Sequence, residues 1–200
     1  MVIFDCDGVM FDSRKANIAF YNTILQHFGK SPLTDKDIEI VQMFTAEESI
    51  NYLFRDDPRR SDAQEYRRHL DYNQWISLLT MEPYLEEVLS ALKHHYQVAL
   101  ATNRTNTIHP ILKRFNLDKY FDFVVSALDV NNPKPHPESL FKILNHFSID
   151  APEAVYVGDS MVDYEVTQKT NILFIAYKHP QLKAAYHIGD LRELLLLLSR

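Results

Sequence analysis

The stretch IFDCDGVMFDS (residues 3–13) places two carboxylates, Asp5 and Asp7, directly after an apolar run near the start of the chain. β-Branched and aromatic residues followed by a turn glycine, Gly8, predict a short buried strand that ends in a loop. Two acids at the carboxyl end of such a strand must be well solvated or must hold a positive group. This stretch therefore predicts both the start of a sheet and a candidate site.

Further apolar, β-rich runs predict four more strands, at residues 97–101, 122–126, 154–157 and 172–176. Segments of helical character adjoin them, at roughly 83–94, 104–116, 137–147 and 160–169. Strands that alternate with helices indicate an α/β fold with a doubly wound, mostly parallel sheet that helices cover on both faces. In such sheets ligands bind at the carboxyl ends of the strands.

The stretch between the first two predicted strands has a different character. It contains no convincing strand but several helical periodicities, and it is far too long for a plain crossover. We therefore predict an α/β core formed by residues 1–13 and 81–200, with a helical insert at residues 14–80. The insert leaves the sheet right after the acidic pair, which places it at the predicted site.

Composition limits the partners and the compartment. The chain has 200 residues, 46% of them hydrophobic, one cysteine and a net charge of -6. The acidic balance argues against nonspecific nucleic-acid binding, and no apolar stretch is long enough to span a membrane. The early first strand leaves no room for a signal peptide, so we expect a cytoplasmic protein. The leucine run at 194–198 indicates core packing first and a dimer contact second, so we expect a monomer or a weak homodimer.

Polar side chains follow each of the first four predicted strands. They are Asp5, Asp7, Thr102, Asn103, Lys134, Asp159 and Asp163. Each has an ordinary structural explanation: a threonine often caps a helix, a lone lysine usually lies on the surface, and Ser160 with Asp163 can form a capping box. Such explanations do not predict that every strand end carries a suitable group, so together these residues indicate one site.

Hard oxygen ligands and a lysine at one sheet edge suit a divalent cation beside a phosphate. Asp5, Asp159 and the backbone carbonyl of Asp7 can bind the cation, and Asp163 can orient its ligands. Lys134 offers a positive charge to a phosphate, and the Thr102 hydroxyl offers a hydrogen bond. We also expect amides to point at the phosphate from a helix that opens directly after Asn103.

Four segments carry a family resemblance: DCDGVMFDS, ATN, KPHPE and GDSMVD. Their order and spacing resemble the four motifs of the haloacid dehalogenase superfamily of phosphatases and phosphomutases, over almost the whole chain. The helical insert resembles that family's smaller helical cap. The resemblance implies a Rossmann-like catalytic core and an enzyme that uses Mg²⁺.

The resemblance also implies roles for individual residues. Asp5 is the expected nucleophile, which forms an aspartyl phosphate, and Asp7 is the expected acid and base. The dehalogenase branch lacks the second acid, so Asp7 indicates phosphoryl transfer. Thr102, Asn103 and Lys134 are the expected substrate-binding residues. The expected metal ligands are Asp5, Asp7, Asp159 and Asp163.

The leading hypothesis is a phosphatase that acts on a small phosphorylated metabolite, most like the phosphoglycolate phosphatase group. A sugar phosphomutase similar to β-phosphoglucomutase shares the same motifs, and an inorganic pyrophosphatase is a further alternative. A phosphoaspartate signalling receiver also combines acids, a threonine and a lysine on a doubly wound sheet. Receivers are shorter and carry the phosphoacceptor on a middle strand of the chain, so the position of Asp5 argues against one.

Overall fold

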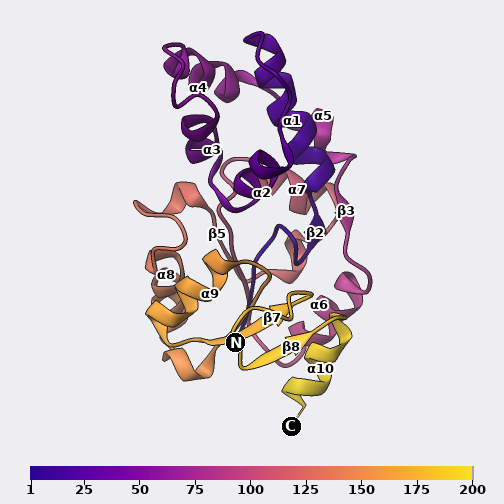
Figure 1. Cartoon of the computed structure of the whole chain (residues 1–200). Coiled ribbons are helices and arrows are strands. Elements are labelled where there is room, and N and C mark those ends of the chain that lie inside the picture. The colour runs from indigo at the N-terminus through magenta and orange to yellow at the C-terminus, as the bar shows by residue number, and fades with distance from the viewer. Residues whose placement is uncertain (200) are drawn as a thin grey trace. The chain divides into compact units, whose positions relative to one another are not determined.

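The computed structural model describes residues 1–199, in two compact units. One unit joins Met1–Phe11 to Met81–Arg200, and the other comprises Asp12–Thr80. The first is the α/β unit and the second contains helices α1 to α5 (Figure 1). We refer to them as the core and the helical unit.

The core is built on a six-stranded sheet in which every adjacent pair of strands is parallel. Its strands, in spatial order, are β5 (Phe123–Val125), β4 (Val98–Ala101), β1 (Val2–Phe4), β6 (Val155–Gly158), β7 (Leu173–Tyr177) and β8 (Tyr186–Ile188). This order confirms the predicted fold class. The sequence did not indicate β8 because this edge strand has three residues, of which Tyr186 and His187 are exposed.

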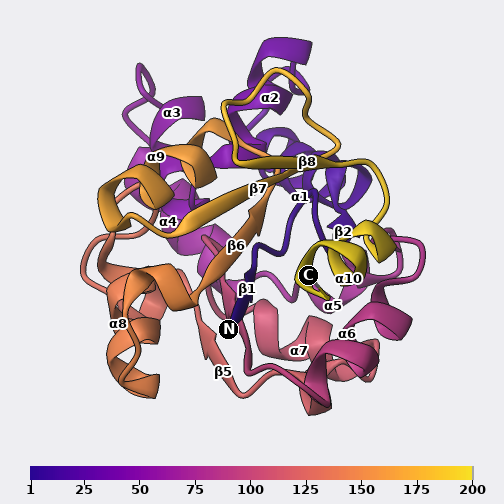
Figure 2. The same cartoon turned by 90° about the horizontal axis from the view of Figure 1, so that it is seen from below.

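Helices cover both faces of the sheet (Figure 2). On one face lie α8 (Glu138–Phe147) and α9 (Met161–Thr170), and on the other lie α6 (Leu85–Lys93), α7 (Ile108–Arg114) and α10 (Arg192–Leu198). Ile3 in β1 is aligned with Ala99 in β4 and Tyr156 in β6, and all three belong to one buried cluster with residues of α8 and α9. A sheet buried on both faces needs continuously apolar strands, which explains their composition.

The segment after β4 departs from the prediction. We expected a helix from residue 104, but α7 begins at Ile108, with Thr107 in the capping position. Three polar residues, Thr105 to Thr107, precede it and favour a turn over a helix. The expected helix amides next to Asn103 are therefore absent from this part of the described chain, and that part of the phosphate-site prediction is wrong.

The helical unit consists of five helices: α1 (Arg14–His27), α2 (Asp35–Met43), α3 (Ala46–Leu53), α4 (Arg60–His69) and α5 (Asn73–Ile76). Capping boxes start α2, between Thr34 and Asp37, and α3, between Thr45 and Glu48. Aromatic side chains around Phe20 pack α1 against α5. Two-residue strands β2 (Phe11–Asp12) and β3 (Thr80–Met81) form a separate small sheet where the chain enters and leaves this unit.

Three short 3₁₀ helices complete the core: η1 (Asp118–Tyr120), η2 (Ala127–Asp129) and η3 (Ala151–Glu153).

Among the helices of residues 1–199, none is both long enough and apolar enough to cross a membrane.

Candidate active site

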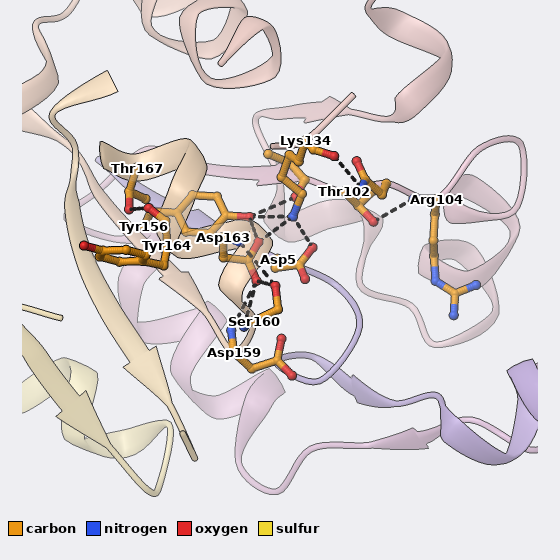
Figure 3. Close-up of polar contacts among 12 residues, drawn as sticks. Asp5, Thr102, Arg104, Lys134, Tyr156, Asp159, Ser160, Asp163, Tyr164 and Thr167 are labelled. Atoms are coloured by element: carbon orange, nitrogen blue, oxygen red, sulfur yellow. Dashed lines mark hydrogen bonds and ion pairs between the residues drawn. The ribbon is translucent and has the colours of Figure 1, made fainter. Parts of the chain in front are cut away.

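The carboxyl ends of three adjacent strands bring most of the predicted residues together. Asp5 directly follows β1, Thr102 follows β4 and Asp159 follows β6. The parallel register places these strand ends side by side at one edge of the sheet. Lys134, in the loop between β5 and α8, and Asp163, in the first turn of α9, reach the same place (Figure 3).

Lys134 is a buried cation in this site. Its side chain is 3% exposed, so it is not the surface lysine of the ordinary explanation. Its Nζ donates to Asp5 Oδ1 at 2.8 Å, to the Tyr156 hydroxyl at 2.7 Å and to Asp163 Oδ1 at 2.7 Å (Figure 3). An ammonium group has three N–H donors, so the protein engages all of them. A bound phosphate would interact electrostatically with Lys134 without a direct hydrogen bond, or would replace one of these three acceptors.

Asp163 serves both local structure and the site. Its Oδ2 accepts from the Ser160 hydroxyl at 2.6 Å and completes the capping box that starts α9. Its Oδ1 accepts from Lys134 and from the Tyr156 hydroxyl, the latter at 2.8 Å. Burial by itself favours the neutral acid, but Lys134 and these hydrogen bonds hold the pKa of Asp163 below its ordinary value. Asp163 is therefore an ionised anchor for Lys134.

Three carboxylates in this site lie close enough to share a cation. Asp5, Asp159 and Asp163 each offer one oxygen, and these oxygens lie within 4.8 Å of one another. Burial, followed by repulsion from Asp163, raises the pKa of Asp5 to about 7 and that of Asp159 to about 9. One lysine does not neutralise three buried carboxylates, and oxygen ligands at this spacing fit a divalent cation.

Two glycines give the acids the space they occupy. A Cβ on Gly8, whose φ is +80°, would lie 1.8 Å from Asp159 Oδ2. A Cβ on Gly158 would lie 2.5 Å from the Cβ of Asp163. Any side chain at either position would push an acid out of the cluster, so both turns are built around the carboxylates.

Thr102 and Asn103 have local partners that the sequence did not indicate. Thr102 Oγ1 accepts from the backbone N–H of Arg104 at 3.1 Å, so the threonine organises its own loop and does not cap α7. Its hydroxyl proton can be donated to a ligand oxygen. Asn103 Nδ2 donates to the backbone carbonyl of Lys134 at 2.9 Å. Asn103 thereby holds the loop that carries Lys134, and its contact with substrate stays a prediction.

The side chain of Asp7 points to a different partner from that of Asp5. Arg104 Nη2 donates to Asp7 Oδ1 at 2.6 Å, and the carboxylate of Asp7 is not part of the acidic cluster. The predicted metal contact through the Asp7 carbonyl remains a prediction. Cys6, between the two acids, is buried, and burial raises the pKa of its thiol well above the ordinary value, so it is not a reactive thiolate.

Sequence reasoning missed two residues of this site, Tyr156 and Arg104. Tyr156 lies within an apolar strand and gave only the signal of a core residue, although its hydroxyl contacts both Lys134 and Asp163. Arg104 is 97 residues from Asp7 in the sequence. The one available signal was its position directly after the Thr-Asn pair.

Comparison with known proteins assigns the chain to one family. The model of the haloacid dehalogenase-like hydrolase family matches residues 2–177. The chain therefore belongs to this family of hydrolases, as its motifs indicated.

Individual relatives agree with this assignment. A haloacid dehalogenase-superfamily hydrolase of subfamily IA from Geobacter sulfurreducens superposes with a TM-score of 0.80 and is 39% identical, over 98% of this chain and 95% of that one. The pyrophosphatase PpaX of Bacillus velezensis is 28% identical over 81% of this chain and 75% of the relative. A phosphoglycolate phosphatase of Pseudomonas fluorescens is 25% identical over 90% of this chain and 69% of the relative.

Proposed function

We propose that this protein is a Mg²⁺-dependent phosphatase that hydrolyses a small phosphomonoester through a phosphoryl group carried on Asp5. The observation that carries the proposal is the environment of Asp5. Lys134 occupies Oδ1, and none of residues 1–199 donates a hydrogen bond to Oδ2. An anchored carboxylate with one oxygen left open is suited to attack phosphorus.

Two steps complete the proposed reaction. Asp5 attacks phosphorus, the bond from phosphorus to the leaving oxygen breaks, and Asp7 gives that oxygen a proton. Water then attacks phosphorus, its proton passes to Asp7, and the bond between phosphorus and Asp5 breaks. Both residues return to their starting state, and the products are an alcohol and phosphate.

Negative charge must be neutralised for a carboxylate to approach a phosphate. Asp5, Asp159 and the Asp7 carbonyl would hold Mg²⁺ with Asp163 in support, and the ion supplies charge neutralisation for the phosphoryl oxygens when it is bound. Lys134 adds a second positive charge beside Asp5, and Thr102 adds a hydroxyl donor. Asn103 keeps the Lys134 loop in place.

The proposal extends to the helical unit and to the setting of the enzyme. We infer that residues 14–80 form a cap that selects the substrate, on the basis of the length of the insert and its position in the sequence after Asp7. The net charge of -6 supports a small metabolite rather than a nucleic acid as the substrate. The one free, buried cysteine supports a cytoplasmic setting.

A pyrophosphatase is the second candidate, and the likeness to PpaX favours it. Pyrophosphate carries a phosphate as leaving group and needs the same nucleophile and the same charge neutralisation. A phosphomutase would use the same Asp5 but would protect the phosphorylated enzyme from water.

A phosphate-release screen tests these candidates. It compares phosphorylated metabolites, pyrophosphate and nitrophenyl phosphate, each with Mg²⁺ and with a chelator. We expect Mg²⁺-dependent release from a phosphomonoester, and acid-trapped protein should carry the phosphate on Asp5. Preference for pyrophosphate would favour the second candidate, and a phosphorylated enzyme that survives in water would favour a mutase.

The control for this screen is a pair of matched variants. Asp5→Asn removes the nucleophile, whereas Asp56→Asn changes an acid whose side chain is 91% exposed in the helical unit. Only Asp5→Asn should abolish turnover. Phosphate release by Asp5→Asn at the wild-type rate would refute the mechanism.

A further inference from the structure

We propose that Arg104 is a positioning residue for Asp7: it holds Oδ1 of this carboxylate so that Oδ2 is the oxygen that carries the transferred proton. The inference rests on the proposed function, in which Asp7 is the acid and base. It adds a residue that neither the motifs nor the acidic cluster includes.

The geometry of the pair is that of a built contact. Arg104 Nη2 lies 2.6 Å from Asp7 Oδ1, and the two side chains are 7% and 20% exposed. Nη1 donates to Thr107 Oγ1 at 3.4 Å, which holds the other arm of the guanidinium. The Arg104 backbone is also fixed, because its N–H donates to Thr102 and its carbonyl accepts from Ala127 at 2.9 Å.

The chemistry of a guanidinium makes this contact directional. Arginine stays protonated and only donates, so Oδ1 must remain an acceptor in both forms of Asp7. A proton on Oδ1 would point at the guanidinium N–H, so the acid form carries its proton on Oδ2. Within residues 1–199, no group donates a hydrogen bond to Oδ2. The two oxygens of Asp7 therefore have different tasks.

The assignment gives Oδ2 a place in each step of the reaction. In the first step the Oδ2–H bond breaks as the O–H bond of the leaving alcohol forms. In the second step a water O–H bond breaks and the Oδ2–H bond re-forms, while the bond between phosphorus and Asp5 breaks. Arg104 takes no proton in either step.

Asp7 needs such a restraint because of the chain that follows it. Gly8 adopts a positive φ, and its N–H donates to the carbonyl of Phe11, so the chain turns directly after Asp7. Arg104, which follows β4, fixes the Asp7 carboxylate independently of that turn. Arg104 is a poor candidate for direct phosphate binding, since Asp7 already neutralises its charge and its side chain is almost fully buried.

Two esters of similar shape separate this role from a structural one. Nitrophenyl phosphate has a good leaving group that needs little protonation, whereas phenyl phosphate needs the acid. For Arg104→Met we expect phenyl phosphate turnover to fall about 10–100-fold, less than the roughly 10²–10⁴-fold worth of the acid–base group itself, because the variant misplaces Asp7 without removing it. Nitrophenyl phosphate turnover should fall about threefold or less. KM for both esters should stay within about threefold of wild type. Arg104→Lys retains a donor and should recover part of the loss.

A double-mutant cycle supplies the decisive control. In an Asp7→Asn background, Arg104→Met should cause no further loss on phenyl phosphate, because both changes disable the same group. Equal losses on the two esters, a large rise in KM, or additive losses in the cycle would each overturn the assignment. If Arg104→Met does not fold, the same cycle with Arg104→Lys gives the same two outcomes.

The test also separates this inference from the proposed function. Full activity of Asp7→Asn on phenyl phosphate would overturn the role of Arg104 while leaving the chemistry of Asp5 intact. Phosphate trapped on a residue other than Asp5 would overturn the proposed mechanism and this inference with it.

Discussion

Two ion pairs, one in each unit of the molecule, have the same length and opposite effects. In the helical unit Arg59 donates to Asp57 Oδ2 at 2.8 Å. The hydrogen bonds from the side chain and the backbone of Arg59 hold the pKa of Asp57 well below its ordinary value. In the core Lys134 donates to Asp5 Oδ1 at the same 2.8 Å, yet burial and the nearby Asp163 raise the pKa of Asp5 to about 7. The distance between a carboxylate and its cationic partner therefore does not by itself determine the pKa of the carboxylate.

The difference lies in what surrounds each pair. Asp57 accepts from two cations, Arg59 and Lys30, whereas Asp5 shares one lysine with Asp163. The pair in the helical unit is balanced and contributes to local structure. The site in the core gathers three buried carboxylates around one lysine, and such clusters with raised pKa values are typical of functional sites.

The largest expected effect comes from removing one carboxylate of each pair. Asp5→Asn should reduce turnover by roughly 10⁴-fold or more, because it removes the proposed nucleophile. It should leave the melting temperature in chelator at pH 8 equal to or above that of wild type, since it relieves repulsion among buried acids. Asp57→Asn should keep full activity and lower the melting temperature. A stability loss for Asp5→Asn as large as that for Asp57→Asn would contradict the comparison.

The second effect compares two of the lysines that form ion pairs with acids in the core, Lys134 and Lys178. Lys134→Met should lower turnover by about 10²–10³-fold and destabilise the fold by about 3–5 kcal/mol, because it leaves Asp5 and Asp163 buried without their cation. Lys178→Met breaks a pair with Glu82, but the Lys178 side chain is 49% exposed, so its loss should amount to less than about 1 kcal/mol. Chemical denaturation measures both. If Lys134→Met and Lys178→Met lose the same stability, the ion pairs of Lys134 contribute no more than an exposed ion pair.

Two glycines with positive φ provide the third test. Gly8→Ala and Gly29→Ala share the backbone strain of that conformation, about 1 kcal/mol or more. Only the Gly8 methyl meets Asp159, whereas a Cβ on Gly29 has nothing within 4 Å. We expect Gly8→Ala to weaken Mg²⁺ binding by about 10–100-fold in calorimetric titration, and Gly29→Ala to leave it unchanged. Unaltered Mg²⁺ affinity in Gly8→Ala would place the cation elsewhere.

The smallest expected effect is a dependence of stability on pH in the metal-free protein. Asp5 and Asp159 have pKa values raised to about 7 and about 9, above the ordinary value of 3.8. Their contribution to stability is fully present below pH 4 and is lost as the pH rises through these raised values. The melting temperature in chelator should therefore fall between pH 6 and pH 9.

Added Mg²⁺ should offset this fall, so the shift in melting temperature that it causes should grow with pH across the same window. Asp5→Asn serves as the control, since it removes one titrating group and should flatten the lower part of the curve. A shift from Mg²⁺ that is constant from pH 6 to pH 9 would contradict the raised pKa values.

The sequence predicted the central strands within a residue or two because their signal is local. Apolar β-branched runs such as Val2–Phe4 and Val98–Ala101 are buried on both faces, so composition alone identifies them. The strand Tyr186–Ile188 lies at the edge, where burial is incomplete and the signal is weak. The start of α7 shifted to Ile108 because polar residues at 105–107 favour a turn.

The sequence by itself determined the type of sheet and the order of the polar residues at the strand ends, since these follow from local composition and spacing. Tertiary structure decided their partners. It set three acceptors around Lys134, among them Tyr156, and it paired Arg104 with Asp7 across 97 residues of chain. It also raised the pKa of Asp5, because burial and the approach of other acids arise only when distant strands meet and exclude water.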